Sequence, residues 1–252
     1  MNLFKLSIIL AIFVTSSCAT IKQEKKRVLF VVSNVSDMGD PEKHDARNNL
    51  WESAPPYHVF LNHGYEVDFV SPKGGPVEFS MNPIGISRYA IKYERFNEKT
   101  QKTLKPDEVD PQKYDAVYFG GGAGPLFDVA HDKNTQKIVS EIYENGGLIG
   151  GCGHGPGGFA NITLSNGTYL VKGKRIAAFP DSTERTKPWA KQGTLLPFLV
   201  ESQLKKNGAI ALNKTHLADK YEVIIDKRIV TTMFLPSAAI VAKEMIIEME
   251  KN

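Results

Sequence analysis

The chain has 252 residues, of which 42% are hydrophobic and 23% are charged, a composition typical of a globular protein with one sizeable core. Thirty-one basic residues against 28 acidic residues leave a formal net charge of only +3. No basic stripe with interleaved aromatic residues is present, which argues against nucleic acid as a partner.

Residues 1–17 are predicted to be a secretory signal peptide. A short basic start is followed by the apolar run LSIILAIFV and by small residues, and the run is too short to span a membrane. Cys18, directly after the small residues, resembles the acylated cysteine of bacterial lipoproteins. We therefore expect lipidation at Cys18, a polar linker over 18–26 and a place in the cell envelope, with membrane contact only through the lipid. Without lipidation, the protein would be secreted.

The first half of the remaining chain predicts two buried strands with a helix between them. Residues 27–33 form a continuous apolar run, as a buried parallel strand requires. After a polar loop over 34–48, a helix-periodic stretch ends at Gly64, and residues 65–75 read as a strand followed by a turn. Residues 76–112 have no clear period and predict no element.

The second half alternates strands and helices. Strands are predicted over 114–122, 174–179 and 221–232, helices over 134–147 and 237–248, and a strand, tight turn and helix over 148–162. This alternation predicts an α/β fold: a single flavodoxin-like three-layer sandwich over 27–250, with a mostly parallel sheet and helices on both faces.

A glycine-rich segment lies where the strand of 148–162 turns into its helix: Gly150-Gly151-Cys152-Gly153-His154-Gly155-Pro156. Such an elbow needs small residues because its backbone is strained and closely approached, and it presents one side chain beside a helix N-terminus. A helix N-terminus lowers the pKa of a thiol and offers amides to an oxyanion. The elbow is therefore the candidate site.

Several blocks of the chain resemble the ThiJ/PfpI, class I glutamine amidotransferase-like superfamily, in its glyoxalase III and heat-shock chaperone-like branch. The elbow, the segment Leu50–Tyr57, the YEV…SPKGG stretch of 65–75 and the LPSAA segment of 235–239 occur in the family's order. The resemblance implies a cofactor-free protein that converts methylglyoxal to lactate through a nucleophilic cysteine followed by His, Gly and Pro. Aligning His154-Gly155-Pro156 with that pattern places Gly153 at the nucleophile position and Cys152 one residue early.

Two structures of the elbow remain open for Cys152. If it is the last residue of the strand, a shift of one position turns its side chain to the opposite face, and it is an inert core residue. If the glycine-rich turn is re-registered, Cys152 occupies the tip and is the nucleophile.

The resemblance implies roles for further residues. Glu52 would shuttle a proton next to the nucleophile, whereas an ordinary surface glutamate is the alternative. His154 would be the site histidine, and Asp181 would accept its other N–H, unless Asp181 only caps a turn. The backbone amides of Gly121, Gly122 and Gly153 would face a substrate oxygen, although glycine is also needed in plain turns.

Two functions of different classes follow. The first is a glyoxalase III-type lyase (hydro-lyase) that detoxifies small reactive carbonyl compounds without glutathione; the second is a non-catalytic envelope chaperone or small-molecule-binding protein. No metal is predicted, because five histidines lack ligand spacing and are expected to be isolated surface residues: His44, His58, His63, His131 and His216. A homodimer is compatible with the sequence.

Overall fold

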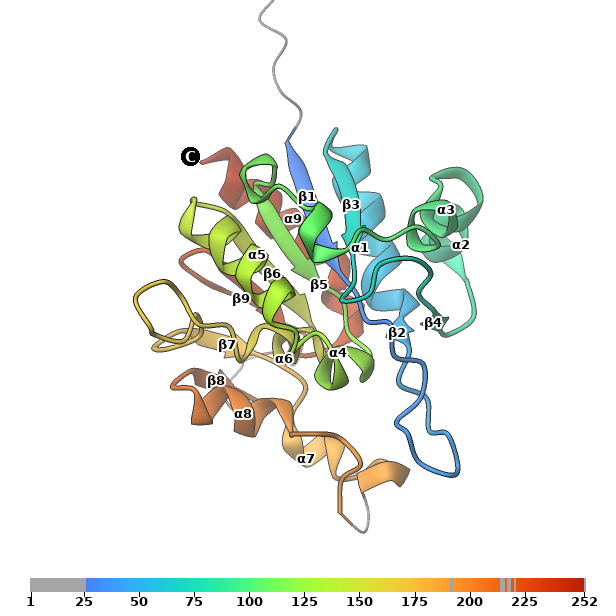
Figure 1. Cartoon of the computed structure of the whole chain (residues 1–252), viewed down its shortest axis with the longest axis vertical. Helices are drawn as coiled ribbons and strands as arrows, with labels where there is room; N and C mark the ends of the chain where they lie inside the picture. Colours follow the sequence, from blue (N-terminus) through green and yellow to red (C-terminus); the bar gives the residue numbers. More distant parts are fainter. Residues whose placement is uncertain (1–25, 191–192, 214–215, 217–218, 220, 252) are drawn as a thin grey trace, which may run out of the picture.

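The computed structural model describes residues 26–251 apart from 191, 192, 214, 215, 217, 218 and 220. Its main sheet has six strands in the order β3-β1-β5-β6-β10-β9 (Figure 1). These strands are β1 (Arg27–Val31), β3 (Glu66–Val70), β5 (Ala116–Phe119), β6 (Leu148–Cys152), β9 (Val223–Asp226) and β10 (Ile229–Thr232). All neighbours pair in parallel except β9 and β10. The predicted α/β fold with a mostly parallel sheet is confirmed.

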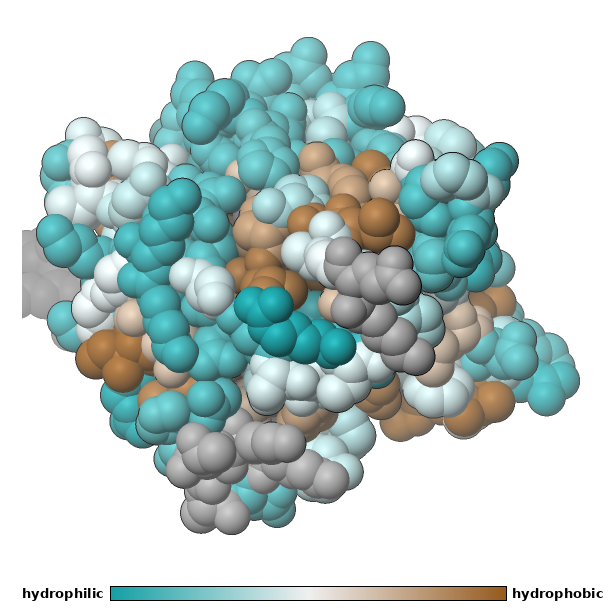
Figure 2. Space-filling view, turned by 90° about the horizontal axis from the view of Figure 1, so that it is seen from below, coloured by the Kyte–Doolittle hydropathy of each residue, from teal (hydrophilic) through white to brown (hydrophobic). Residues whose placement is uncertain are grey.

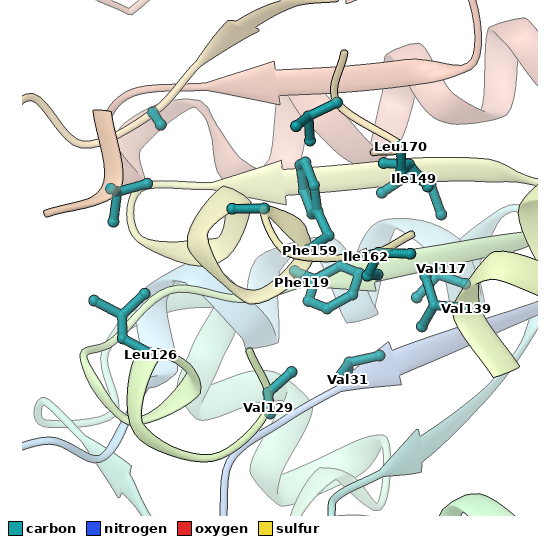
Figure 3. Close-up of a cluster of buried hydrophobic side chains, with 14 of the residues drawn as sticks. Val31, Val117, Phe119, Leu126, Val129, Val139, Ile149, Phe159, Ile162 and Leu170 are labelled. Atoms are coloured by element: carbon teal, nitrogen blue, oxygen red, sulfur yellow. The ribbon is translucent and has the colours of Figure 1, made fainter. Parts of the chain in front are cut away.

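Strand alternation sorts the apolar side chains into two cores, one on each face of the sheet. Phe30 and Tyr118 belong to one core, whereas their neighbours Val31 and Phe119 belong to the other. Figure 3 shows the second core, where Phe119 and Phe159 lie close to Ile162. Helices cover both cores: α1 (Leu50–Asn62) and α9 (Ala238–Glu250) on one face, and α5 (Lys133–Glu144), α6 (Gly155–Phe159) and α8 (Val200–Lys206) on the other.

Shorter elements decorate this sandwich. Two small parallel pairs flank the sheet: β2 (Asn48–Asn49) with β4 (Phe79–Ser80), and β7 (Arg175–Ala177) with β8 (Ile210–Leu212). The short helices are α2 (Gly85–Tyr93), α3 (Phe96–Thr100), α4 (Gly124–Phe127), α7 (Asp181–Glu184), η1 (Pro106–Glu108), η2 (Pro111–Lys113), η3 (Pro188–Ala190) and η4 (Leu235–Ser237). None of the helices in the described part of the chain combines the length and apolarity needed to cross a membrane.

Two predicted strands take a different form. The stretch 221–232 is an antiparallel hairpin of β9 and β10, because the chain turns at Lys227, whose φ of 55° lies in the left-handed region. Residues 174–179 contain β7, which pairs with β8 outside the main sheet. The predicted signal peptide, Cys18 and most of the linker lie outside the described residues.

Helix α1 contains two prolines close to its start, and the sheet compensates for one of them. Pro56 has no N–H, so the carbonyl of Glu52, one helical turn earlier, loses its intrahelical partner. The buried Tyr118 hydroxyl of β5 donates to this carbonyl at 2.9 Å. The side chain of Asn49 caps the helix by accepting from the Trp51 amide at 2.9 Å. The first turn of α1, which carries Glu52, is therefore fixed to the sheet.

Candidate active site

The candidate site lies at the carboxyl ends of the parallel strands, where ligands bind in open α/β sheets. Figure 2 shows this end of the molecule, with apolar residues gathered near the middle and hydrophilic residues around them. Three segments meet at the candidate site: the start of α1, the glycine loop after β5 and the elbow after β6.

The Glu52 side chain lies against the glycine loop that follows β5. A Cβ atom at Gly121 would lie 1.3 Å from Oε2 of Glu52, so the carboxyl occupies the space that any side chain at 121 would need. The amide of Asn49 also donates to the Gly121 carbonyl at 2.9 Å. Gly122, with φ of 103°, packs on the backbone of Arg47–Asn49. The absence of side chains at Gly121 and Gly122 therefore lets the start of α1 and the Glu52 carboxyl pack directly against this loop.

Glu52 is buried, and few groups of the protein donate hydrogen bonds to its carboxyl. Its exposed fraction is 5%. Oε1 faces the Asn49 side-chain amide at 3.4 Å, and Oε2 has no hydrogen-bond partner among the described residues. Burial raises the pKa of Glu52 to about 8, although the Gly121 amide favours the ionised form. Glu52 is therefore largely a neutral acid at pH 7, and it is not the surface glutamate that was the alternative.

Gly153 is the tip of the elbow. Its φ of 58° is left-handed, a conformation that favours glycine. A Cβ at this position would lie 2.8 Å from both carboxyl oxygens of Glu52. The Gly153 amide donates to the Thr232 carbonyl at 3.1 Å. The tip of the elbow thus points at Glu52, but its amide is already engaged, in contrast to the predicted role facing a substrate oxygen.

Cys152 is the last residue of β6 and belongs to the core. It pairs in register with Thr232, is 0% exposed, and packs in the core beneath α1 and α9. Burial and the charge of Glu52 raise the pKa of its thiol well above the usual value. The first alternative for the elbow is therefore the observed one: alternation along the strand turns Cys152 away from the tip, and its predicted place as the nucleophile is wrong.

His154 follows the tip and is held by two contacts. Its ring stacks on Phe179 with centroids 4.4 Å apart, and its Nε2 lies 2.5 Å from Oε2 of Glu184. Trp189 donates from Nε1 to the other Glu184 oxygen at 2.6 Å. Burial raises the pKa of Glu184, but His154 and Trp189 outweigh this effect and the pKa lies below its usual value. Glu184 is thus a carboxylate that orients His154.

Asp181 is not the partner of His154. Its Oδ2 accepts a hydrogen bond from the Ser202 hydroxyl, and its backbone amide donates to Glu201 at 3.1 Å. These contacts tie α7 to α8. One turn of α7 carries the chain from Asp181 to Glu184, and the second acid, rather than the first, faces the histidine. The predicted pairing is therefore wrong by one helical turn.

The loop after β1 reaches the same network through His44. Its Nδ1 lies 2.8 Å from Oδ2 of Asp40, and its ring packs edge-on against Trp189 with centroids 6.2 Å apart. His44 is therefore not an isolated surface histidine. Among the described residues, Asp40, Glu42 and His44 bring potential metal ligands within 4.8 Å of one another, but Asp40 already accepts hydrogen bonds from this loop and Glu42 is exposed.

Comparison with known proteins places the chain in a family. The model of the DJ-1/PfpI family matches residues 46–248. The chain belongs to the DJ-1/PfpI family. Glyoxalase 3 of Candida albicans is 31% identical over 212 residues, which cover 80% of this chain and 89% of that protein. The glutathione-independent glyoxalase HSP31 of Saccharomyces cerevisiae is 33% identical over 217 residues, 82% and 90% of the two chains.

A solved structure of a family member superposes over most of the chain. The crystal structure of glyoxalase III from Candida albicans has a TM-score of 0.79 and 26% sequence identity, and the match covers 91% of this chain and 99% of that chain. The ThiJ/PfpI resemblance inferred from the elbow and the segment around Glu52 is thus supported along nearly the whole domain.

Sequence reasoning missed Glu184, Trp189 and Tyr118. Asp181, the predicted partner of His154, lies at the start of α7, and only the winding of that helix selects Glu184. A signal for Tyr118 did exist, because Pro56 inside a helix predicts an unpaired carbonyl at Glu52 that some donor must satisfy.

We predict that Glu52→Gln stabilises the protein increasingly as the pH rises. The unfolded chain ionises Glu52 above its usual pKa of 4.5, whereas the folded chain keeps the proton up to about 8. Between these values ionisation favours unfolding, so the wild type loses up to about 1.4 kcal/mol per pH unit relative to the variant. Denaturant unfolding at pH 4 to 9 measures the difference. Glu141→Gln, on α5, is the control, and parallel curves for Glu52→Gln and wild type would contradict the burial of an ionisable Glu52.

We predict that the Cys152 thiol is unreactive in the folded protein. In a Cys18→Ser background, a thiol reagent should label Cys152 only after denaturation, because the side chain is buried and its pKa is raised. Cys152→Ala should lower the free energy of unfolding by about 1 kcal/mol, as is common for a small core truncation. Labelling of the native protein at the rate of an exposed thiol would show that the elbow adopts the other register.

Proposed function

We propose that this protein is a glyoxalase III-type protein acting on small 2-oxoaldehydes such as methylglyoxal, with Glu52 as the group that transfers the proton. One observation carries the proposal. The Glu52 carboxyl is buried, has a pKa of about 8 and an unpaired oxygen, and lies 2.8 Å from the position that a Cβ atom at Gly153 would take. A carboxyl with these properties can both accept and return a proton near neutral pH.

The reaction needs such a group. Conversion of methylglyoxal and water to lactate moves a hydrogen from the aldehyde carbon C1 to the ketone carbon C2. Water first adds to the aldehyde to give the hydrate CH3–CO–CH(OH)2. Ionised Glu52 then removes the C1 proton of the hydrate and, once protonated, delivers a proton to C2, while a hydroxyl proton of C1 passes to the oxygen of C2. The carboxyl is therefore unchanged after a turnover. We expect the overall reaction to be of the lyase class.

The histidine beside the elbow fits the same chemistry. His154 is fixed by stacking on Phe179 and by its bond to Glu184. The Glu184 carboxylate fixes the orientation of the imidazole, as the acid of a catalytic triad does. His154 can therefore hold a substrate oxygen by a hydrogen bond while Glu52 transfers the proton.

The family relationship supports the substrate class. Two relatives that match more than three quarters of this chain are named glyoxalase 3 and glutathione-independent glyoxalase. Their names concern those proteins, and the arrangement of Glu52 and the elbow is the reason to extend the activity to this chain.

A second candidate function is binding of small carbonyl compounds without turnover. The observation that favours it is Gly153, which gives the elbow no nucleophile, together with Cys152, which faces the core. The two functions make different predictions for a variant that restores a thiol at the tip.

We predict that Gly153→Cys raises the rate of methylglyoxal conversion to lactate above that of the wild type, measured without added thiol or metal. The new Cβ would start 2.8 Å from the Glu52 oxygens, so the carboxyl, at the end of a flexible side chain, has to turn slightly and then contacts the sulfur. The gain should be at least about tenfold, which corresponds to about 1.4 kcal/mol of transition-state stabilisation. The strained φ should cost about 1 kcal/mol of stability.

Gly153→Ser is the matched control, because it has a similar size and the same strain but a far weaker nucleophile. It should stay at the wild-type rate. A folded Gly153→Cys variant that produces no lactate, together with raised thermal stability of the wild type in the presence of methylglyoxal, would favour binding without turnover.

We also propose that the protein is a lipoprotein of the cell envelope, anchored through Cys18. The order of a basic start, an apolar run, small residues and a cysteine supports this location. In a bacterial host, the wild type should fractionate with membranes and carry a lipid mass on Cys18, whereas Cys18→Ala should move to the soluble fraction. A soluble wild type with no lipid mass would contradict the anchor.

A further inference from the structure

The elbow of this protein is shaped for glycine. The Gly153 backbone is left-handed, and a Cβ there would come within 2.8 Å of both Glu52 oxygens, closer than carbon and oxygen normally approach. In the native chain the carboxyl therefore occupies space that a cysteine side chain at the tip would need. Position 153 has no thiol, and the Glu52 carboxyl lies where the side chain of a cysteine would begin.

The described residues supply no other thiol to the site. Cys152 is the free cysteine of the described residues, and it is fully buried with its side chain in the core below α1 and α9. Because β6 alternates, Cys152 shares its face with Leu148, whereas the tip at Gly153 meets the carboxyl of Glu52. Among the described residues no thiol reaches the tip of the elbow, so a sulfur at that point has to come with the substrate.

We propose that the substrate is the hemithioacetal of a 2-oxoaldehyde with a low-molecular-weight thiol, so that the small thiol supplies the sulfur that the elbow lacks. This inference rests on the proposed function. Thiols add to aldehydes in solution without a catalyst, which makes the adduct available wherever both compounds occur. The sulfur acidifies the adjacent C1–H, which makes the proton transfer easier than in the hydrated aldehyde.

The step balances without an oxidant or a metal. The thiol R–SH adds across the aldehyde of methylglyoxal to give CH3–CO–CH(OH)–SR. Ionised Glu52 takes the C1 proton to give an enediolate, the second carbon receives a proton from the carboxylic acid, and the hydroxyl proton of C1 passes to the oxygen of C2. The product is the thioester CH3–CH(OH)–CO–SR, an isomer of the hemithioacetal, and water later cleaves it to lactate and R–SH.

The site has features that suit this substrate. Oε2 of Glu52 is buried and lacks a hydrogen-bond partner among the described residues, so no contact within this part of the protein competes with the C1 proton for it. Gly153 carries no side chain, so the sulfur of the adduct can take the place beside the tip once the Glu52 carboxyl, at the end of a flexible side chain, turns slightly. The His154 ring next to it, fixed by Glu184, can hold an oxygen of the enediolate.

The test is thiol dependence of the full-length protein. Methylglyoxal is mixed with 2-mercaptoethanol, cysteine or glutathione, and thioester formation is followed by ultraviolet absorbance alongside lactate. We expect the wild-type rate to rise with hemithioacetal concentration to at least about a hundred times the rate without thiol, the range of a general acid–base contribution. Prior reduction with a phosphine, removed before the assay, controls for a merely reducing effect.

Variants separate Glu52 from the fold. Glu52→Gln should lose about a hundredfold or more of the thioester rate. Glu94→Gln is the matched control, because Glu94 is also a largely buried glutamate with an unpaired oxygen but contacts His58 away from the elbow. The kcat/KM of the wild type for the adduct should rise with pH and level off above about 8, as Glu52 becomes ionised.

Two results would overturn the inference in distinguishable ways. If wild-type turnover is the same with and without thiol, or if no thioester forms while Gly153→Cys is active, the hemithioacetal is not the substrate and the proposed function stands. If neither the wild type nor folded Gly153→Cys acts on methylglyoxal under any of these conditions, the proposed function fails and the inference fails with it.

Discussion

The burial of one carboxyl against bare backbone organises the site end of this molecule. Glu52 can lie where it does only because Gly121 and Gly153 have no side chains: a Cβ at the first would lie 1.3 Å from its carboxyl and at the second 2.8 Å. Desolvation then raises its pKa to about 8. Close packing and acid–base character are thus two consequences of the same contact.

The position of that carboxyl depends in turn on an irregular helix. Pro56 removes the hydrogen bond that would normally hold the Glu52 carbonyl, and the Tyr118 hydroxyl replaces it from the sheet. The neighbouring cap residue, Asn49, joins the same helix to the Gly121 carbonyl. A regular helix would have satisfied its own backbone, whereas this one is attached to β5 and to the glycine loop at the turn where Glu52 lies.

Local patterns predicted what depends on local structure. Apolar runs located the strands, and the glycine-rich elbow was found where β6 turns into α6. Alternation along β6 correctly offered a buried Cys152 as one alternative. Contacts between distant segments could not be predicted in this way: Glu184, rather than Asp181, meets His154 because of how α7 winds. The turn at Lys227 split a predicted strand because a non-glycine residue adopts a left-handed backbone that composition does not reveal.

The elbow and the carboxyl contribute to stability with opposite sign. Glycine at a left-handed tip avoids the strain that a cysteine would impose, so in this chain the elbow is relaxed. Glu52 is the reverse case, because an acid with an unpaired buried oxygen destabilises the fold and could be replaced by an apolar residue if only packing mattered. The elbow carries no strained side chain, yet the destabilising acid Glu52 and the His154–Glu184 pair are present. A scaffold that only bound or filled space would have no need of that acid, and a site that moves protons would.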